Sequence, residues 1–197
     1  MPRKPVIRKE DITNAAFEIV RLNGQEALNA RALAERLGCS TQPIFSNFSS
    51  MDELFNEVLI RCLESYNDCV RKEFARQQGF PTYKTYGMAY IRFAKEQKNL
   101  FKVLFMRDKT GEQTGVEEST FLEVLPVIMK ALDLTREQAS LFHLEMWTFV
   151  HGIGSMIATS SFDWDMDLAS RTLTDAYQGL KQRFEQLKTE AANEQRH

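Results

Sequence analysis

Cysteine is scarce in this 197-residue chain, which has only three, and proline and glycine number five and nine. Three cysteines do not make a disulfide framework, and reduced thiols fit a cytosolic protein. Cys62 and Cys69 share one face of an expected helix, about 10 Å apart along its axis, which is too far for a disulfide. No strand pattern, internal repeat or low-complexity tract appears, so the sequence predicts an all-α protein.

Long hydrophobic runs are also absent, because the longest apolar stretches are well short of a membrane span. The first residues contain no apolar signal core. We therefore expect a cytoplasmic protein that does not contact a membrane.

Enzyme signatures are lacking as well: the sequence has no glycine-rich phosphate loop, no His-Glu-x-x-His and no Cys-x-x-Cys. His143 and His151 are eight residues apart, too far for a metal pair on one helix turn, so a core or interface role is favoured. Glu145 stands in an apolar helix, where it could orient a polar ligand group or pair with a neighbouring Arg or His. Pairing is the favoured alternative. We expect no catalytic residue, no metal and no cofactor.

What the chain does contain is ordinary for a globular protein, with 43% hydrophobic and 26% charged residues. Its length suits one large domain or two small ones. The net charge of −2 divides unevenly. Residues 1–48 carry seven Lys or Arg against five acids, and residues 49–197 carry 18 against 22. The basic excess therefore belongs to the N-terminal part of the chain.

Two short helices with a tight connection are predicted near the N-terminus. Arg31–Leu37 has apolar residues at helical spacing, Asn29 before it is a good N-cap, and Gly38 ends it. Ser40 can cap the next segment, and Pro43 falls in its first turn, where a missing N–H costs little. This arrangement is typical of a helix-turn-helix unit, whose second helix enters the DNA major groove. Any two short packed helices could give the same pattern.

The surrounding sequence favours DNA binding. The relevant segments, collinear and without gaps, are Ile12–Ala16, Asn23–Gly24, Leu28–Ala34, Leu37–Ser40, Ile44–Phe45, Phe48 and Met51–Leu54. Together they resemble the N-terminal domain of the TetR family of bacterial transcriptional regulators. Phe45, Asn47 and Met51 stand where the family usually has Tyr, His and Lys, residues that usually contact DNA phosphates.

The resemblance implies a three-helix DNA-binding head followed by about six helices, and helical periodicity also gives nine. The expected helices span 9–23, 31–37, 41–48, 51–78, 81–97, 99–106, 115–132, 136–160 and 166–188. Capping boxes are predicted at Ser50/Glu53, Thr114/Glu117 and Thr135/Gln138. The helix up to residue 160 is apolar over most of its circumference, which predicts a central buried helix.

We expect three segments of different kinds. Residues 1–50 form the DNA-binding domain, with a basic arm over 1–8. Residues 51–188 form a C-terminal domain for effector binding and dimerisation, and residues 189–197 form a disordered tail.

The candidate DNA-contacting residues cluster around the second helix of the motif. They are Arg31, Ser40, Thr41, Gln42, Pro43, Phe45, Ser46, Asn47 and Ser50. Gln can read adenine, Thr can contact a thymine methyl, and Arg suits guanine or a phosphate. Ser49 and the first N–H groups of the helix at Met51 are further phosphate candidates. For Phe45 a core position is an equal alternative.

Phenylalanine, methionine and tryptophan fall mostly after residue 49, where they can pack a core or line an adaptable pocket. The candidate pocket residues are Met88, Phe105, Phe121, Trp147 and His151. The segment Trp147–Gly152 resembles a Trp-x-x-x-His-Gly element of one group of TetR-family C-terminal domains.

These observations lead us to expect a ligand-responsive repressor, homodimeric through helices 136–160 and 166–188, that binds a near-palindromic duplex DNA operator. Its small-molecule effector is not identified by the sequence. An all-helical protein-interaction module and a small helical enzyme are the alternatives. Sequence-specific DNA binding separates the repressor from both of them.

Overall fold

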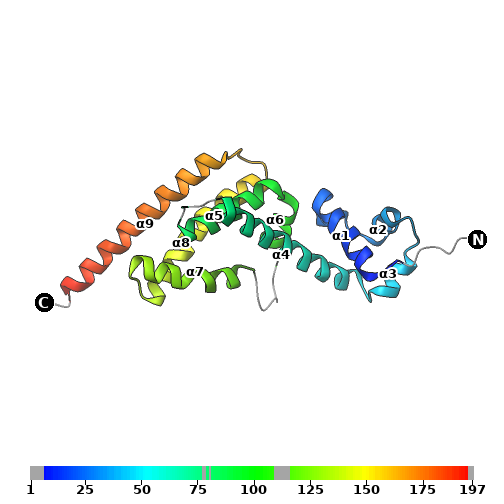
Figure 1. The fold of residues 1–197 in the computed structure, drawn as a ribbon, viewed down its shortest axis with the longest axis horizontal. Coiled ribbons are helices and arrows are strands. Elements are labelled where there is room, and N and C mark those ends of the chain that lie inside the picture. Colours follow the sequence, from blue (N-terminus) through cyan, green and yellow to red (C-terminus); the bar gives the residue numbers. More distant parts are fainter. Residues whose placement is uncertain (1–6, 77–78, 80, 109–115, 195–197) are drawn as a thin grey trace, which may run out of the picture. The chain divides into compact units, whose positions relative to one another are not determined.

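The computed structural model describes residues 7–76, 79, 81–108 and 116–194. In these ranges the chain forms nine α-helices and one short 3-10 turn, without a strand (Figure 1). The predicted all-α fold is therefore confirmed. The chain divides into two compact units, the first made of residues 1–68 with 96–109 and the second of residues 69–95 with 110–197.

Unit 1 contains the helices of the expected DNA-binding head. In chain order these are α1 (Lys9–Asn23), η1 (Gln25–Ala27), α2 (Ala30–Leu37), α3 (Gln42–Asn47), the part of α4 (Met51–Arg76) up to residue 68, and α6 (Lys98–Phe105). Its core is apolar and closed to solvent, and the side chains of Ile12, Ala16, Val20, Leu33, Ile44, Leu54 and Val58 are all 0% exposed. Burial of these side chains supplies most of the driving force for folding the unit.

The predicted domain boundary at residue 50 falls inside unit 1. The unit continues along α4 and recruits α6 from further along the chain. α6 packs on α1, where the Asn99 side-chain amide donates to the Arg21 carbonyl at 3.1 Å. Phe105 of α6 also meets the ring of Tyr66 of α4 at 5.3 Å between centroids. A short apolar helix thus closes the head through a contact between residues 78 apart in sequence, which periodicity alone does not predict.

Unit 2 contains the rest of α4 with α5 (Thr82–Glu96), α7 (Val116–Leu132), α8 (Arg136–Ala158) and α9 (Met166–Glu194). α8 and α9 form an antiparallel hairpin. Near the start of α8, Lys188 donates to the Leu132 carbonyl at 2.8 Å, and the rings of Phe142 and Phe184 lie 5.5 Å apart. At the other end, the Asp165 side chain accepts from the Leu168 N–H at 2.6 Å and begins α9.

The capping predictions have different outcomes. The box at Thr135 and Gln138 is confirmed by both reciprocal hydrogen bonds, of 3.3 and 3.0 Å. Ser50 accepts from the Glu53 N–H at 3.1 Å as predicted, but the Glu53 carboxylate accepts from Ser49 instead of closing back on Ser50. Thr114, predicted to open α7, lies outside the described residues.

Two helix predictions are wrong in detail. The tail expected over 189–197 is helical up to Glu194, because the sequence after Lys188 is rich in helix-forming Glu and Ala. Residues 195–197 lie outside the described part of the chain. α8 is not buried all round within one chain, since four large apolar side chains are 44–55% exposed: Leu141, Leu144, Phe149 and Met156.

Candidate DNA-binding surface and C-terminal aromatic cluster

The turn between α2 and α3 is fixed by backbone hydrogen bonds. The Asn29 side chain caps α2 by accepting from the N–H groups of residues 31 and 32 at 3.1 and 3.0 Å. Gly38 ends the helix with φ 64° and ψ 32°, in the left-handed region. Its N–H bonds to the Glu35 carbonyl, and that of Cys39 bonds to the Ala34 carbonyl at 3.0 Å. This pair of bonds is a Schellman motif, which stops α2 and turns the chain towards α3.

α3 begins one residue later than predicted. Thr41, not Ser40, occupies the N-cap position, in a helical conformation and without a side-chain capping bond. Ser40 precedes it as an exposed residue. Pro43 lies in the first turn, as predicted, where its fixed φ suits a helix start. The 3-10-like start explains the shift, because the Ile44 N–H reaches the Thr41 carbonyl at 3.1 Å.

Two apolar residues hold α3 against the rest of unit 1. Ile44 is 0% exposed and Phe48 is 2% exposed, whereas Phe45 between them is 51% exposed. The core alternative for Phe45 is therefore wrong, and this ring is presented to solvent. Because α3 has only six residues, its stability comes from these anchors and not from helix propensity.

The polar side chains of α3 line its outer side. Gln42 and Ser46 are exposed, and Asn47 is half-buried. Ser46 donates to the Gln42 carbonyl at 2.9 Å, and the Asn47 amide donates to the Pro43 carbonyl at 2.8 Å. These local bonds leave the Ser46 oxygen and the Asn47 amide oxygen able to accept, while Gln42 keeps its whole amide for a partner.

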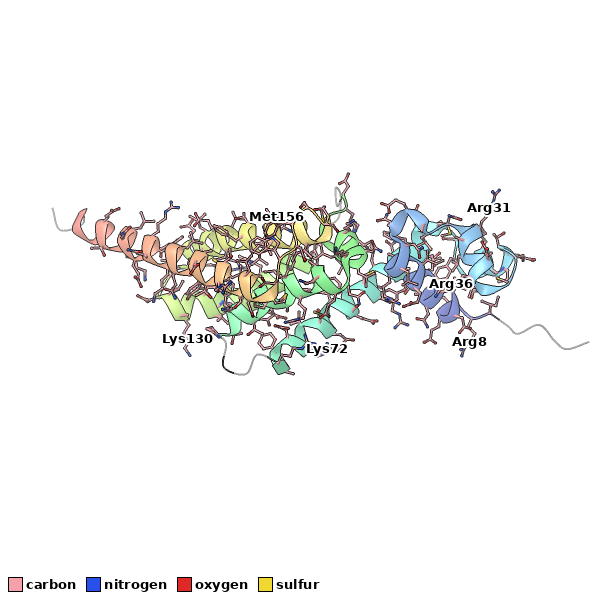
Figure 2. The ribbon with its side chains drawn as sticks, turned by 90° about the horizontal axis from the view of Figure 1, so that it is seen from above. Arg8, Arg31, Arg36, Lys72, Lys130 and Met156 are labelled. Atoms are coloured by element: carbon pink, nitrogen blue, oxygen red, sulfur yellow. The ribbon has the colours of Figure 1, made fainter. Side chains whose placement is uncertain are left out.

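Arg31 projects from the start of α2 away from the helices (Figure 2). It is exposed, and its guanidinium makes no hydrogen bond or ion pair with a described residue. An unpaired Arg of this kind can bind a base edge or a phosphate without first breaking a contact in the protein.

The start of α4 is less open to phosphate than expected. The Glu53 carboxylate accepts from both the N–H and the hydroxyl of Ser49 at 2.7 Å, and this hydrogen bonding lowers the pKa of Glu53. The carboxylate therefore stays charged at neutral pH and occupies the donors that a phosphate would need. Ser50 remains available, because its oxygen accepts from Glu53 and its hydroxyl hydrogen is not used.

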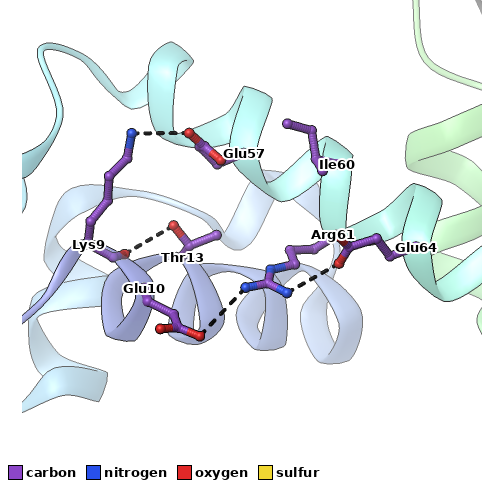
Figure 3. Close-up of a pocket in the computed structure, with 7 residues that line it drawn as sticks. All are labelled: Lys9, Glu10, Thr13, Glu57, Ile60, Arg61 and Glu64. Carbon is purple, nitrogen blue, oxygen red and sulfur yellow. Dashed lines mark hydrogen bonds and ion pairs between the residues drawn. The ribbon is translucent and has the colours of Figure 1, made fainter.

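A shallow polar groove of about 400 Å³ lies between α1 and α4 within unit 1 (Figure 3). Two cations line it. Lys9 lies 3.1 Å from Glu57, and Arg61 lies 3.2 Å from Glu64 and 4.0 Å from Glu10. The groove is therefore lined by ion pairs, and those of Lys9 with Glu57 and of Arg61 with Glu10 link the first helix of the head to α4. Exposed pairs of this kind contribute at most about 1 kcal/mol each.

In unit 2 two tyrosine–histidine pairs connect α5 to α8. The Tyr83 hydroxyl lies 3.0 Å from His143 Nδ1, and the Tyr90 hydroxyl lies 2.8 Å from His151 Nδ1. Burial lowers the pKa of His143, so the imidazole is neutral at pH 7. Sequence reasoning did not identify these pairs. The tyrosines are seven residues apart and the histidines eight, and these similar spacings could have indicated two pairs between the same two helices.

The predicted pocket residues do not all come together. Trp147 stacks on His151 at 4.8 Å, and the Tyr90 hydroxyl lies 2.8 Å from His151 Nδ1, so these three residues form an aromatic cluster. Phe121 lies instead 5.4 Å from His143. Met88 is 2% exposed and packs in the core of unit 2. Phe105 belongs to unit 1, where it packs on Tyr66 and Phe101, so it is not part of that cluster.

A capped helix, a Schellman turn and a second helix with an exposed outer side form a helix-turn-helix unit, the kind of unit found in many DNA-binding proteins. The comparisons with known proteins agree. Residues 12–58 match the family model described as bacterial regulatory proteins, tetR family. Residues 84–177 match the model described as tetracyclin repressor-like, C-terminal domain. The chain belongs to the TetR family of bacterial transcriptional regulators.

A curated relative supports this assignment. It is the uncharacterized HTH-type transcriptional regulator Rv0681 of Mycobacterium tuberculosis, 23% identical over 167 residues. The match covers 84% of this chain and 76% of the relative. The protein is accordingly a DNA-binding transcriptional regulator. Within the described ranges, no helix has the length and hydropathy to cross a membrane.

Proposed function

We propose that α3 reads a near-palindromic DNA operator as the recognition helix. The observation that carries this proposal is the separation of its two sides: Ile44 and Phe48 are buried, while Gln42, Phe45 and Ser46 are exposed. Gln42 lies in the first turn of the helix, and its side-chain amide can bind an adenine edge bidentately. The exposed Phe45 ring offers an apolar surface to a thymine methyl group or to deoxyribose.

Arg31, Ser40, Thr41, Pro43, Asn47 and Ser50 surround this helix, and we propose that they bind phosphates or flanking bases. A two-fold dimer presents two α3 helices, so the half-sites should be about one helical turn, or a multiple of it, apart. The protein then acts in the cytoplasm, where bacterial DNA lies. It represses transcription by occupying the operator.

The test compares operator affinities of Arg31→Ala and Gln42→Ala with the wild type by fluorescence anisotropy. Loss of one good base contact should weaken binding by about 1–3 kcal/mol, or roughly 5–150-fold. Gln178→Ala is the matched control, because Gln178 is exposed on α9 in unit 2. If both head variants bind like the control, α3 and the start of α2 are not the DNA-reading surface.

We also propose that α8 and α9 form the homodimer interface. The supporting observation is the row of exposed apolar side chains on α8, including Leu141, Phe149 and Met156, together with Leu187 on α9. Apolar faces on two adjacent antiparallel helices suit a four-helix interface with a second copy.

Phe149→Glu should convert the dimer to a monomer in sedimentation velocity experiments, because it places a charge inside an apolar interface. Leu22→Glu is the control, since Leu22 is a 54% exposed apolar residue on α1, outside the proposed interface. A Phe149→Glu protein that remains as dimeric as the control would refute this interface.

We further propose that a weakly polar small molecule binds in unit 2 and releases the operator. The aromatic cluster of Trp147, His151 and Tyr90 supports this, because it combines stacking surfaces with a hydrogen-bonding edge. α4 contributes residues to both units and is the element through which binding is expected to affect the DNA heads. A ligand can do so only by its differential affinity for the two states.

A thermal-shift screen of weakly polar compounds identifies candidate effectors, and each hit is then tested in operator binding. For a coupling of about 1–3 kcal/mol, saturating ligand should weaken binding roughly 5–150-fold. Trp147→Phe should abolish the thermal shift if the ring contacts the ligand. Hits that stabilise the protein without changing operator affinity would show a pocket that does not regulate DNA binding.

A further inference from the structure

One carboxylate interrupts the apolar surface of the α8–α9 hairpin. Residues three or four apart along a helix lie on the same side of it. By that rule α8 presents Leu141, Glu145, Phe149, Gly152 and Met156 together, and α9 adds Gly179, Arg183 and Leu187 beside them. We call this set the hairpin face. Apart from Glu145 and Arg183 it is apolar or carries no side chain.

Glu145 is incompletely satisfied within one chain. Its Oε1 lies 3.4 Å from Arg183 Nη1, which is long for a charge-assisted hydrogen bond. Its Oε2 is buried and has no hydrogen-bond partner. The Arg183 side chain is 60% exposed, so most of its five donors face solvent. A buried acceptor without a donor is costly, and native proteins rarely leave one unpaired.

The hairpin face is also open to close approach. A Cβ atom added at Gly152 or at Gly179 would meet nothing within 4 Å. Backbone without side chains on two adjacent helices lets another helix pack closely there. The face therefore combines an apolar surface, room for a close helix crossing, and one acidic and one basic group that are underused in a single chain.

We propose that a second copy of this chain completes the site. In this arrangement Arg183 of each copy donates to the Glu145 carboxylate of the other, whose side chain is 25% exposed in a single chain, so that two symmetry-related pairs cross the interface. The inference rests on the proposed dimer and goes further by naming its specificity-determining residues. A two-fold axis makes this possible, because residue i of one copy contacts residue j of the other and the reverse also holds.

The function of the two pairs is selection of partner and register. An apolar interface alone tolerates sliding and mispairing with related chains, whereas buried charges are satisfied in one register only. A relative without an acid at position 145 and a base at position 183 would leave a charge unpaired and would be rejected.

The test uses charge reversal and mixing. Glu145→Arg and Arg183→Glu each place like charges together, both within a chain and across the interface, so each variant alone should be largely monomeric. When the two variants are mixed, the contacts across the interface become opposite in sign while those within each chain remain like. We therefore expect heterodimers to outnumber either homodimer in native mass spectrometry, with the variants distinguished by mass.

Two further variants complete the design. The double variant Glu145→Arg/Arg183→Glu restores opposite charges everywhere and should form homodimers again. Glu145→Gln keeps the shape of the side chain and should raise the dimer dissociation constant about tenfold or more. It also gives a result if a charge-reversed chain fails to fold. Circular dichroism of each variant checks that its helix content is that of the wild type.

The possible outcomes are distinct. A double variant that dimerises, with no heterodimers in the mixture, would place the pair within one chain and overturn the inference while leaving the dimer. Random mixing of the two single variants, each dimeric alone, would show that the charges do not select the partner. A monomeric wild type would overturn both the dimer and this inference.

Discussion

Replacing Gly38 tests how the turn of the DNA-binding head is held. Gly38 has φ 64°, and a Cβ atom at this position would meet nothing within 4 Å. Any effect of Gly38→Ala must therefore come from the backbone conformation and not from a clash. The left-handed region costs an L-residue about 1–2 kcal/mol. Alanine also restricts the unfolded chain, which offsets about 0.4–1 kcal/mol of that loss.

The net expectation is a loss of about 1 kcal/mol in the free energy of unfolding for Gly38→Ala. Gly38→Asn is the matched variant, because asparagine adopts the left-handed region more readily, and it should be less destabilising. Urea unfolding followed by circular dichroism measures both. An alanine variant as stable as the wild type, or an asparagine variant less stable than alanine, would refute the reasoning.

Three further predictions concern charge, pH and packing. Met51→Lys should steepen the dependence of log operator affinity on log salt by about one unit, by adding a phosphate contact; an unchanged slope would count against that contact. The lowered pKa of His143 means that the unfolded chain takes up its proton at higher pH than the folded one, so stability should fall as pH drops below about 6.5. His143→Gln should flatten this part of the curve in thermal unfolding at several pH values, and an unaltered curve would contradict the assignment. Gly152→Ala should stabilise the helix by roughly 0.5–1 kcal/mol while raising the dimer dissociation constant in sedimentation equilibrium, and an unchanged dimer would argue against close crossing there.

Local signals predicted the head well. Asn29, Gly38 and Pro43 act within one or two turns of their own position, so their caps and stops could be predicted from neighbouring residues alone. The same applies to the capping box at Thr135. Ser40 was the exception, because two adjacent hydroxyl residues can both begin a helix and the 3-10-like start favoured Thr41.

Features that depend on packing between distant segments could not be predicted in this way. The α6 helix was expected, but its place on α1 depends on Asn99 reaching a carbonyl 78 residues away. Phe105 was assigned to a pocket because its segment is apolar, and only the fold shows that it belongs to the head. Apolar residues around most of α8 predicted burial, yet periodicity does not distinguish a protein core from a surface that another chain can cover.

The construction of α3 affects how readily this protein can acquire a new operator. Its fold depends on the buried Ile44 and Phe48, whereas positions 42, 45 and 46 are exposed. Substitutions at exposed positions usually change stability by less than about 0.5 kcal/mol. If α3 is the recognition helix, as proposed, sequence preference can drift at these three positions while the scaffold is unchanged. A duplicated gene could diverge in target recognition through a few neutral steps, without an unstable intermediate.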